Sequence, residues 1–404
     1  MKSFKYRLYP TNTQKALLSK HFGATRFVYN YFLAQRRDYY LQHKEDIQQK
    51  NIKGSLNYYD NAKELTQLKK QEATTWLKEI NAQSLQTCLK DLEGAYRRFF
   101  NKQAQFPKFK KKHGSTNSFR VPQHVRVEEN QIFFPKFKEG IKVKFHRPLE
   151  GKLINATVSR NPAGHYFVSV SCEVEIVHYE TTNKNVGLDL GIKDFAVCSD
   201  EQTFSNPKPL KALEKRLAFR QKHLSTKQKG SQSRNKARNQ VAKVHNKIRN
   251  QRHHFLHQAS SKMIHENQVI ILEDLNVKGM MKNHKLAKAI SDSSWSRFVT
   301  FLEYKASWYG RDIVKIDRWF PSSKMCGNCH YIHDELTLKD RHWTCPECNT
   351  KHDRDLNASK NILTQGLNLL SGSGTESDTK QKREEALTLV ESMNPEAYLS
   401  LANG

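Results

Sequence analysis

Alternating apolar and polar positions predict β-structure in the first half of the chain. In SFKYRLY (3–9) the apolar side chains fall on one face and the basic ones on the other, which is typical of a half-buried strand. The alternation returns in QIFFPKFKEGIKVKF and in LINATVSRNPAGHYFVSVSCEVEI, where NPAG supplies a turn. We therefore predict small antiparallel β-structure over 116–180, which the first strand rejoins.

Helical periodicity fills the stretch between these strands. Pro10 ends the first strand, and Thr11 and Gln14 match a capping box at the start of a helix. We expect residues 20–100 to be helical throughout. One buried face is predicted near the end of this stretch, where apolar residues recur at three- and four-residue steps: Leu85, Cys88, Leu89, Leu92, Tyr96 and Phe99.

The second half of the chain alternates strands with helices. NVGLDLGIKDFAVC (185–198) predicts two strands around a turn, and the apolar run QVIILEDLNV (268–277) predicts a strand buried on both faces. Helices are expected at 207–264, as two helices joined by a loop, and at 293–309, before a strand in DIVKI. This order predicts a mixed α/β sheet. After Leu370, glycine, serine and mixed charge predict a linker and a loosely ordered tail.

Charge changes this picture by indicating a polyanionic partner. The chain has 68 Lys+Arg against 40 Asp+Glu, a net charge of +28, and basic proteins gain affinity for nucleic acid by releasing counterions. Between Lys208 and Arg252 there are fifteen basic residues and one acid, Glu214, which favours contact with a phosphate backbone over a merely solvated face. We found no apolar run near 18 residues and no signal peptide, so we expect no membrane partner and a cytoplasmic location.

Four of the seven cysteines predict a zinc site. Cys326, Cys329, Cys345 and Cys348 follow the pattern C-x2-C-x15-C-x2-C, in which two tight turns close a tetrahedron of thiolates. Four thiolates leave no position for water, so we expect one structural Zn²⁺. A redox pair and an iron–sulfur cluster are the alternatives. Nearby histidines are surplus to this shell and are interpreted as surface or nucleic-acid contacts: His330, His333, His342 and His352. Cys88, Cys172 and Cys198 stand alone in apolar contexts and are expected in the core.

Three acids stand out as ligands for a harder metal. Asp189 has glycine on both sides at i±2, which would leave room for a hydrated metal carrying a phosphate. Glu273 closes an apolar run, and the neighbouring Asp274 is its competitor. Asp355 is the third, with Asp353 as the local alternative. Three carboxylates fit two Mg²⁺ ions, for which Mn²⁺ could substitute, in hydrolysis of a phosphodiester.

The motifs around these residues resemble those of the TnpB family, the small RNA-guided nucleases of bacterial and archaeal insertion sequences. The resemblance runs in order over about 1–366 and rests on these segments: GLDLG (187–191), ILEDL (271–275), PSSKMCGNC (321–329), CPEC (345–348) and DRDLNASKNI (353–362). One departure is His330, where the family commonly has glycine after the second cysteine.

The resemblance implies a multidomain α+β protein with an RNase H-like (RuvC) α/β nuclease domain and an inserted zinc ribbon. It places a helical domain and a small antiparallel β-barrel-like domain before them. The expected boundaries are a wedge-like β domain at 1–20 and 112–182, a helical recognition domain at 21–111, the nuclease domain at 183–318 and 350–366, the ribbon at 319–349 and a flexible tail at 367–404. The implied catalytic residues are Asp189, bridging both Mg²⁺ ions, with Glu273 and Asp355 each holding one.

The implied function is RNA-guided endonuclease cleavage of double-stranded DNA beside a short target-adjacent motif. Its partners would be a guide RNA and target DNA, with the protein a monomer or weak homodimer. Two other functions stay open at this point: an RNA-guided DNA-binding regulator that does not cut, and a transposase-like DNA-processing protein.

Overall fold

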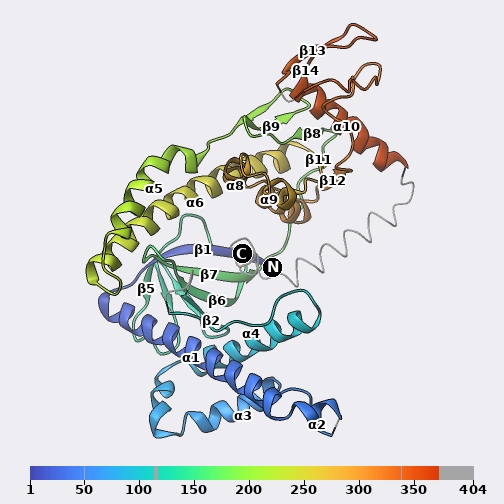
Figure 1. The fold of residues 1–404 in the computed structure, drawn as a ribbon. Coiled ribbons are helices and arrows are strands. Elements are labelled where there is room, and N and C mark those ends of the chain that lie inside the picture. The colour runs from blue at the N-terminus through green and yellow to red at the C-terminus, as the bar shows by residue number, and fades with distance from the viewer. Residues whose placement is uncertain (50, 113–116, 338, 373–404) are drawn as a thin grey trace. The chain divides into compact units, whose positions relative to one another are not determined.

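The computed structural model describes residues 1–49, 51–112, 117–337 and 339–372. They form two compact units, Met1–Glu175 and a second that begins at Ile176 (Figure 1). No helix in the described part of the chain is long and apolar enough to cross a membrane.

The first unit contains a seven-stranded sheet in which all neighbouring strands are antiparallel, in the order β2-β6-β7-β1-β5-β4-β3. Its strands are β1 (Lys2–Tyr9), β2 (Asn117–Val121), β3 (Arg126–Glu128), β4 (Gln131–Phe133), β5 (Ile141–Lys144), β6 (Lys152–Arg160) and β7 (Tyr166–Glu173). Strand β1 lies between β7 and β5, which confirms that the first strand rejoins the later ones. Its apolar face, with Phe4, Tyr6 and Leu8, is buried in a core that also contains Leu18 of the first helix.

Helices fill the rest of this unit: α1 (Asn12–Gln42), α2 (Lys44–Gln48), α3 (Tyr58–Leu68), the 3₁₀ helix η1 (Glu72–Glu79) and α4 (Ala82–Phe100). The predicted capping box is confirmed, because Thr11 Oγ1 accepts from Gln14 N at 3.3 Å and the Gln14 side chain accepts from Thr11 N at 3.0 Å. The expectation of helix throughout 20–100 was wrong, because Asn57 and Asn81 each cap a new helix. The predicted face of α4 is buried except for Phe99, which is partly exposed.

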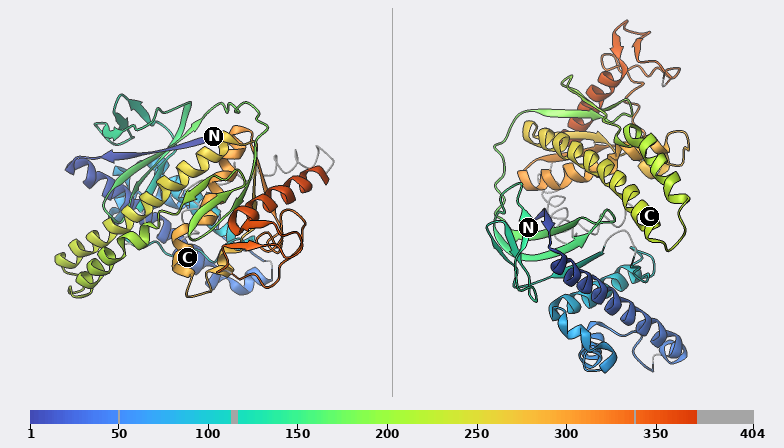
Figure 2. Two further views of the ribbon diagram at one scale, coloured as in Figure 1. Left: turned by 90° about the horizontal axis from the view of Figure 1, so that it is seen from above. Right: turned by 90° about the vertical axis from the view of Figure 1, so that its left-hand side faces the viewer.

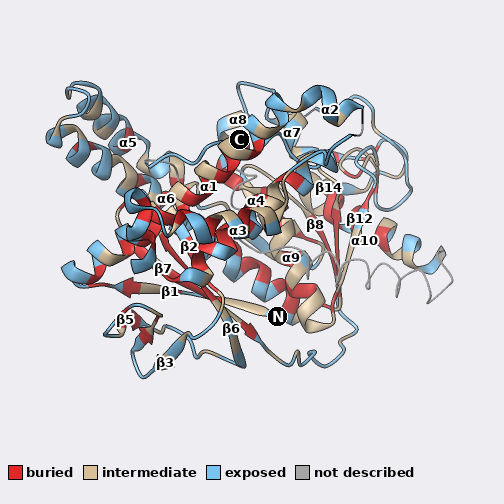
Figure 3. Ribbon diagram, turned by 90° about the horizontal axis from the view of Figure 1, so that it is seen from below, coloured by how far each residue is buried: buried red, intermediate tan, exposed pale blue. Residues whose placement is uncertain are grey.

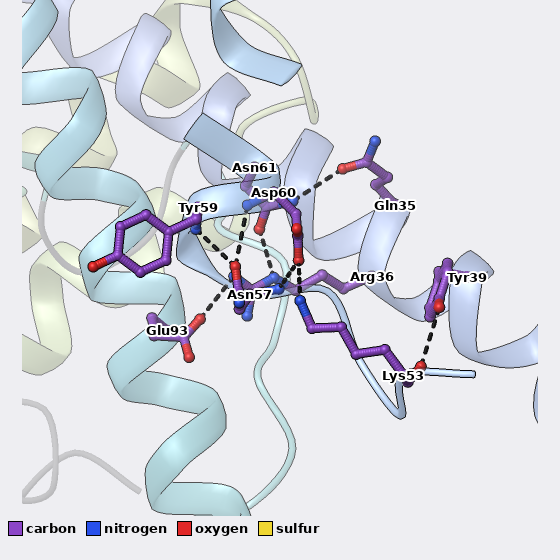
Figure 4. Close-up of polar contacts among 9 residues, drawn as sticks. All are labelled: Gln35, Arg36, Tyr39, Lys53, Asn57, Tyr59, Asp60, Asn61 and Glu93. Carbon is purple, nitrogen blue, oxygen red and sulfur yellow. Dashed lines mark hydrogen bonds and ion pairs between the residues drawn. The ribbon is translucent and has the colours of Figure 1, made fainter. Parts of the chain in front are cut away.

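A buried polar network joins three of these helices (Figure 4). The Arg36 side chain of α1 is 4% exposed, donates to Asn61 Oδ1 of α3 at 2.6 Å and pairs with Glu93 of α4 at 2.8 Å. Arg36 is the buried partner of this pair, whereas the Glu93 side chain is 32% exposed. Arg36 therefore links α1 to both α3 and α4. Asn57 caps α3 by accepting from Asp60 N at 3.1 Å, beside the ion pair that Asp60 makes with Lys53.

The second unit is built on a five-stranded mixed sheet, as the alternating pattern predicted. The strand order is β10-β9-β8-β11-β12; β8, β11 and β12 are parallel, and β9 and β10 run antiparallel to their neighbours. The strands are β8 (Asn185–Asp189), β9 (Asp194–Cys198), β10 (Thr203–Ser205), β11 (Val269–Glu273) and β12 (Asp312–Ile316). A separate pair, β13 (His342–Thr344) and β14 (Lys351–Asp353), lies in the cysteine-rich segment.

Helices cover both faces of this sheet. The helices are α5 (Pro209–Ser225), α6 (Gln232–Glu266), α7 (Val277–Met280), α8 (Ala287–Ser293), α9 (Trp295–Tyr309) and α10 (Arg354–Gly372). Helices α6 and α9 pack on the face that carries Leu188 and Leu272, whereas α10 packs on the face that carries Ile271. Helices α5 and α6 form the predicted pair, side by side (Figure 2), and much of α5 is exposed (Figure 3).

Helix α10 approaches the sheet so closely that two glycines are required. A Cβ on Gly187 would lie 2.2 Å from the Ser359 carbonyl oxygen, and one on Gly366 would lie 2.3 Å from Ile271 Cγ2. The interpretation of Gly187 as room for a hydrated metal was therefore wrong, because α10 occupies that space. The predicted tail begins inside α10, and its residues 373–404 lie outside the described residues.

Candidate metal centres

Asp189 and Glu273 lie next to each other at the carboxyl ends of β8 and β11, two neighbouring inner strands of the five-stranded sheet. Strands β8 and β11 are parallel, and Leu188 pairs with Leu272 immediately before the two acids. Each acid therefore directly follows the last residue by which β8 and β11 pair with each other. Because side chains alternate along a strand, Asp189 shares its face with Gly187 and Glu273 shares its face with Ile271. This is the face on which α10 packs.

Asp355 joins this pair from the first turn of α10. Burial, together with the charges of Glu273 and Asp355, raises the pKa of Asp189 to about 7. The charges of Glu273 and Asp355 both act on Asp189, so acids from three distant parts of the sequence lie in one neighbourhood. The structure places the three predicted acids at the same end of the sheet, although among the described residues only the four cysteines have ligand atoms that all lie within 4.8 Å of one another. The catalytic role of the acids stays a prediction.

Each of the other two acids has a partner that sequence reasoning missed. Ser322 Oγ donates to Glu273 Oε1 at 2.6 Å, while burial raises the pKa of the Glu273 carboxyl. Asp355 makes ion pairs with Arg341 and with Arg354, the latter at 3.1 Å. Ser322 and Arg341 lie in the cysteine-rich segment, and nothing in their local sequence indicates which acid they contact.

The two competing acids have different surroundings. Asp274 makes an ion pair with Arg318, and its side chain is 47% exposed. Asp353 Oδ1 accepts from Leu356 N at 2.9 Å, which makes it the cap of α10. Both therefore have structural partners outside the acidic cluster.

The four predicted cysteines form a second cluster, with all their sulfur atoms within 4.8 Å of one another. Cys326 Sγ lies 3.5 Å from Cys348 Sγ, and Cys329 Sγ lies 3.5 Å from Cys345 Sγ. A tetrahedral zinc site with bonds of about 2.3 Å requires sulfur–sulfur separations of about 3.8 Å. The cysteines therefore fit one Zn²⁺ ion.

The histidines near this cluster do not all lie at the surface as passive contacts. His352 stays outside the group of four cysteines, but its Nε2 lies 3.1 Å from Cys326 Sγ, so it contacts one of the sulfur atoms and is more than a surface residue. His330, at the departure from the family pattern, has a φ of 63°, and Asn349 has a φ of 56° at the equivalent position of the other turn. Both cysteine turns thus end in the left-handed region, which explains why glycine suits this position.

The first cysteine turn is fastened to α10, the helix that carries Asp355. Asn361 Nδ2 donates to the carbonyl oxygens of Ser322 and Met325 at 2.8 and 2.7 Å. Asn357 donates to Met325 O at 2.7 Å and accepts from Gly327 N at 3.0 Å. Both asparagines are at least 95% buried. The segment that carries the first two cysteines is therefore fixed by several hydrogen bonds to the helix that carries Asp355.

Three family models match the chain. A model described as "Probable transposase" matches 168–284, which includes Asp189 and Glu273. A model described as "Cas12f1-like, TNB domain" matches 295–362, which includes the four cysteines and Asp355. A model described as "Helix-turn-helix domain" matches 1–45, although these residues fold here as β1, the single long helix α1 and the start of α2.

Several relatives match along most of their length, and two of them are named as RNA-guided endonucleases at 30% identity or more. A protein of Streptomyces pristinaespiralis named "Putative RNA-guided DNA endonuclease" is 40% identical over 370 residues, 91% of this chain and 89% of the relative. "Putative RNA-guided DNA endonuclease InsQ" of Escherichia coli strain K12 is 30% identical over 391 residues, 92% of this chain and 94% of the relative. The chain belongs to the TnpB family. The resemblance drawn from its motifs is thereby confirmed.

A solved structure has a fold similar to that of this TnpB-family chain. It is a cryo-electron microscopy structure of the Cas12f1-sgRNA-target DNA complex, with a TM-score of 0.52 and 15% identity. The match covers 87% of this chain and 83% of the other. At this identity the likeness concerns the fold, and it supports the predicted mixed α/β architecture.

Proposed function

We propose that this protein is an RNA-guided DNA endonuclease encoded by an insertion sequence. The observation that carries the proposal is the convergence of Asp189, Glu273 and Asp355 in a chain of the TnpB family. The names of both long relatives support it, and so does the structural neighbour, which is a complex of Cas12f1 with sgRNA and target DNA. Guide RNA and double-stranded DNA are the proposed partners, and the net charge of +28 suits them.

The second unit would be an RNase H-like nuclease domain of the RuvC type. Its sheet supports this proposal, because the antiparallel strands β10, β9 and β8 are followed by two strands that run parallel to β8. The acids sit at the carboxyl ends of β8 and β11, where open sheets with parallel strands commonly bind ligands. The cysteine-rich segment between β12 and α10 would then be the inserted zinc ribbon.

The acidic cluster fits divalent metal ions. At Asp189, burial and the charges of two other acids outweigh the nearby arginines and raise the pKa. A divalent cation would relieve this repulsion. Two Mg²⁺ ions held there would activate a water and stabilise the leaving oxygen of a phosphodiester. Asp189, Glu273 and Asp355 would hold the ions, and Ser322 would keep Glu273 in one orientation through its hydroxyl.

The basic helix pair α5–α6 is the proposed grip for the guide–target duplex. Asp292, which is 5% exposed, fixes this pair by accepting from Leu210 N at 3.0 Å and from Arg252 Nη2 at 2.7 Å. One carboxylate thus caps α5 and ties down α6. Phosphate contacts from such a surface fix register without reading sequence, which suits a protein whose target is read by base pairing.

Sequencing of the RNA that co-purifies with the protein tests this function. A structured RNA that ends in a variable segment, followed by Mg²⁺-dependent cutting of DNA matching that segment, is the expected result. Bound guide RNA without any cutting would favour the RNA-guided regulator. DNA processing without bound RNA would favour a transposase, which is the description that one matching family model carries.

A further inference from the structure

Trp319 is the most exposed large apolar side chain in the described part of the chain, at 84%. Single exposed aliphatic residues are ordinary on protein surfaces, but an indole loses a large favourable burial when it stays in water. Its neighbour Phe320 packs against the apolar cluster beneath α10. The segment is thus anchored through Phe320, and Trp319 is its one large apolar side chain left in solvent.

Two anchors hold Trp319 next to the acidic cluster. On one side, Arg318 makes an ion pair with Asp274. On the other, Ser322 Oγ donates to Glu273 Oε1 at 2.6 Å. The backbone N–H of Trp319 donates to Asp317 Oδ1 at 2.7 Å, which fixes the turn between these anchors.

The anchors place the ring within reach of a strand bound at the acids. Glu273 is the last residue of β11 and Asp274 follows it directly, so the two anchors meet neighbouring residues. Trp319 and Ser322 are three residues apart, and three residues of chain span at most about 11 Å. The Cα of Trp319 therefore lies within about 11 Å of the Cα of Ser322, whose hydroxyl contacts Glu273.

The surroundings of the ring suit a nucleic-acid strand. Arg318 precedes it in the chain and pairs with Asp274, while Arg341 and Arg354 contact Asp355 at the acidic cluster where the strand would be bound. Cationic side chains attract phosphates, and exposed aromatic rings stack on bases without regard to sequence. A guided nuclease needs a contact of this kind, because the guide and not the protein reads the bases.

We propose that Trp319 is a stacking platform for one base of the DNA strand that is cut. The proposal rests on the proposed endonuclease function and adds a substrate-positioning residue to it. By stacking, the ring would hold the adjoining phosphate of a single strand against Asp189, Glu273 and Asp355. It would contribute to substrate binding and not to proton transfer or metal binding.

Two measurements on the guide-loaded complex test this role. In the first, single-stranded DNA is added without Mg²⁺, and tryptophan fluorescence is recorded for wild type and Trp319→Phe. We expect quenching in wild type that is largely lost in the variant, because the four other tryptophans are less exposed. Quenching of equal size in Trp319→Phe would overturn the proposal.

In the second, cleavage is measured with Mg²⁺ for wild type, Trp319→Ala and Trp319→Phe. Loss of the ring should raise KM about tenfold with little change in kcat, and Trp319→Phe should restore most of the affinity because it keeps a stacking ring. A set of DNA strands, each lacking one base, adds a control for stacking. Removal of one particular base should weaken DNA binding by the wild-type complex, and it should leave DNA binding by Trp319→Ala unchanged.

The outcomes separate this proposal from the endonuclease function. Cleavage by Trp319→Ala with the wild-type KM would refute stacking and leave the nuclease assignment intact. Quenching that depends on Trp319 in a complex that never cleaves would refute the nuclease assignment and leave the stacking contact standing.

Discussion

The two metal-ligand clusters of this protein are built in opposite ways. The four cysteines come from one short segment, 326–348, and their sulfur atoms lie within 4.8 Å of one another. The three acids come from β8, β11 and α10, and burial together with the charges of the other two raises the pKa of Asp189. The cysteine cluster is thus assembled by two local turns, whereas the acidic cluster requires two strands of the sheet and a helix packed on it. Yet Asn357 and Asn361 fasten the two together.

The largest expected effect comes from removing an acid. Asp189→Ala or Glu273→Ala should lower guide-directed DNA cleavage at least about a thousandfold, because the charge that would hold the metal ions is lost. Guide RNA binding and zinc content should not change. Plasmid cleavage by purified complexes measures this, with Asp274→Asn as the matched control at the neighbouring residue. Equal loss in Asp274→Asn would show that charge at this edge matters and not the particular acid.

Removal of a zinc ligand should have the next largest effect. Cys345→Ser should release zinc, loosen the first cysteine turn and lower cleavage by about a hundredfold, through the asparagine contacts to α10 and the Ser322 contact to Glu273. Zinc content by elemental analysis and cleavage rate are measured together. Full cleavage by zinc-free protein would show that the two clusters are independent.

Asn361→Asp tests the link between the cysteine cluster and the acidic cluster, because it removes hydrogen bonds between them and leaves all four cysteines and all three acids in place. The aspartate keeps the shape of the side chain but donates no hydrogen bond to Ser322 O or Met325 O. Met325 O keeps the Asn357 donor, but the Ser322 carbonyl loses its donor, which costs about 1–3 kcal/mol of stability. We expect about a tenfold loss of cleavage with zinc retained. An unchanged cleavage rate in a variant of lowered melting temperature would contradict this coupling.

The acidic cluster should make stability of the metal-free protein depend on pH. The pKa of Asp189 is raised from 3.8 to about 7, so the folded state holds its proton more tightly than the unfolded chain, and this contribution is lost as pH rises through about 7. Asp189→Asn should therefore stabilise the metal-free protein by about 1 kcal/mol or more at pH 8, and by less as pH falls towards 4. Urea unfolding at several pH values measures this. A gain that does not vary with pH would contradict the assigned cause.

The smallest effect concerns the zinc turns. His330 has a φ of 63°, so His330→Gly should raise stability by about 1 kcal/mol by removing left-handed strain. Asn349→Gly should gain less, because asparagine tolerates the left-handed region better. Thermal unfolding of the zinc-loaded protein compares the two. A larger gain at Asn349 would contradict this explanation.

The sequence predicted those features that depend on local pattern. Alternation of apolar and polar residues predicted β1, and apolar stretches predicted β8 and β11. The spacing of the cysteines predicted that their four sulfur atoms lie close together, as they do in the structure. It could not predict that Asp274 would pair with Arg318, or that Ser322 would contact Glu273, because these depend on how the segment after β12 folds back. Gly187 was misread for the same reason: the need for a glycine came from α10, about 170 residues away in the sequence.

The most direct test of the hard-metal site is a Mn²⁺ titration of the guide-loaded complex with bound DNA, followed by electron paramagnetic resonance. We expect two Mn²⁺ ions in wild type, loss of both tight sites in Asp189→Asn, and one zinc ion in each protein. Tight binding of two Mn²⁺ ions by Asp189→Asn would contradict the assignment of this site to the three acids.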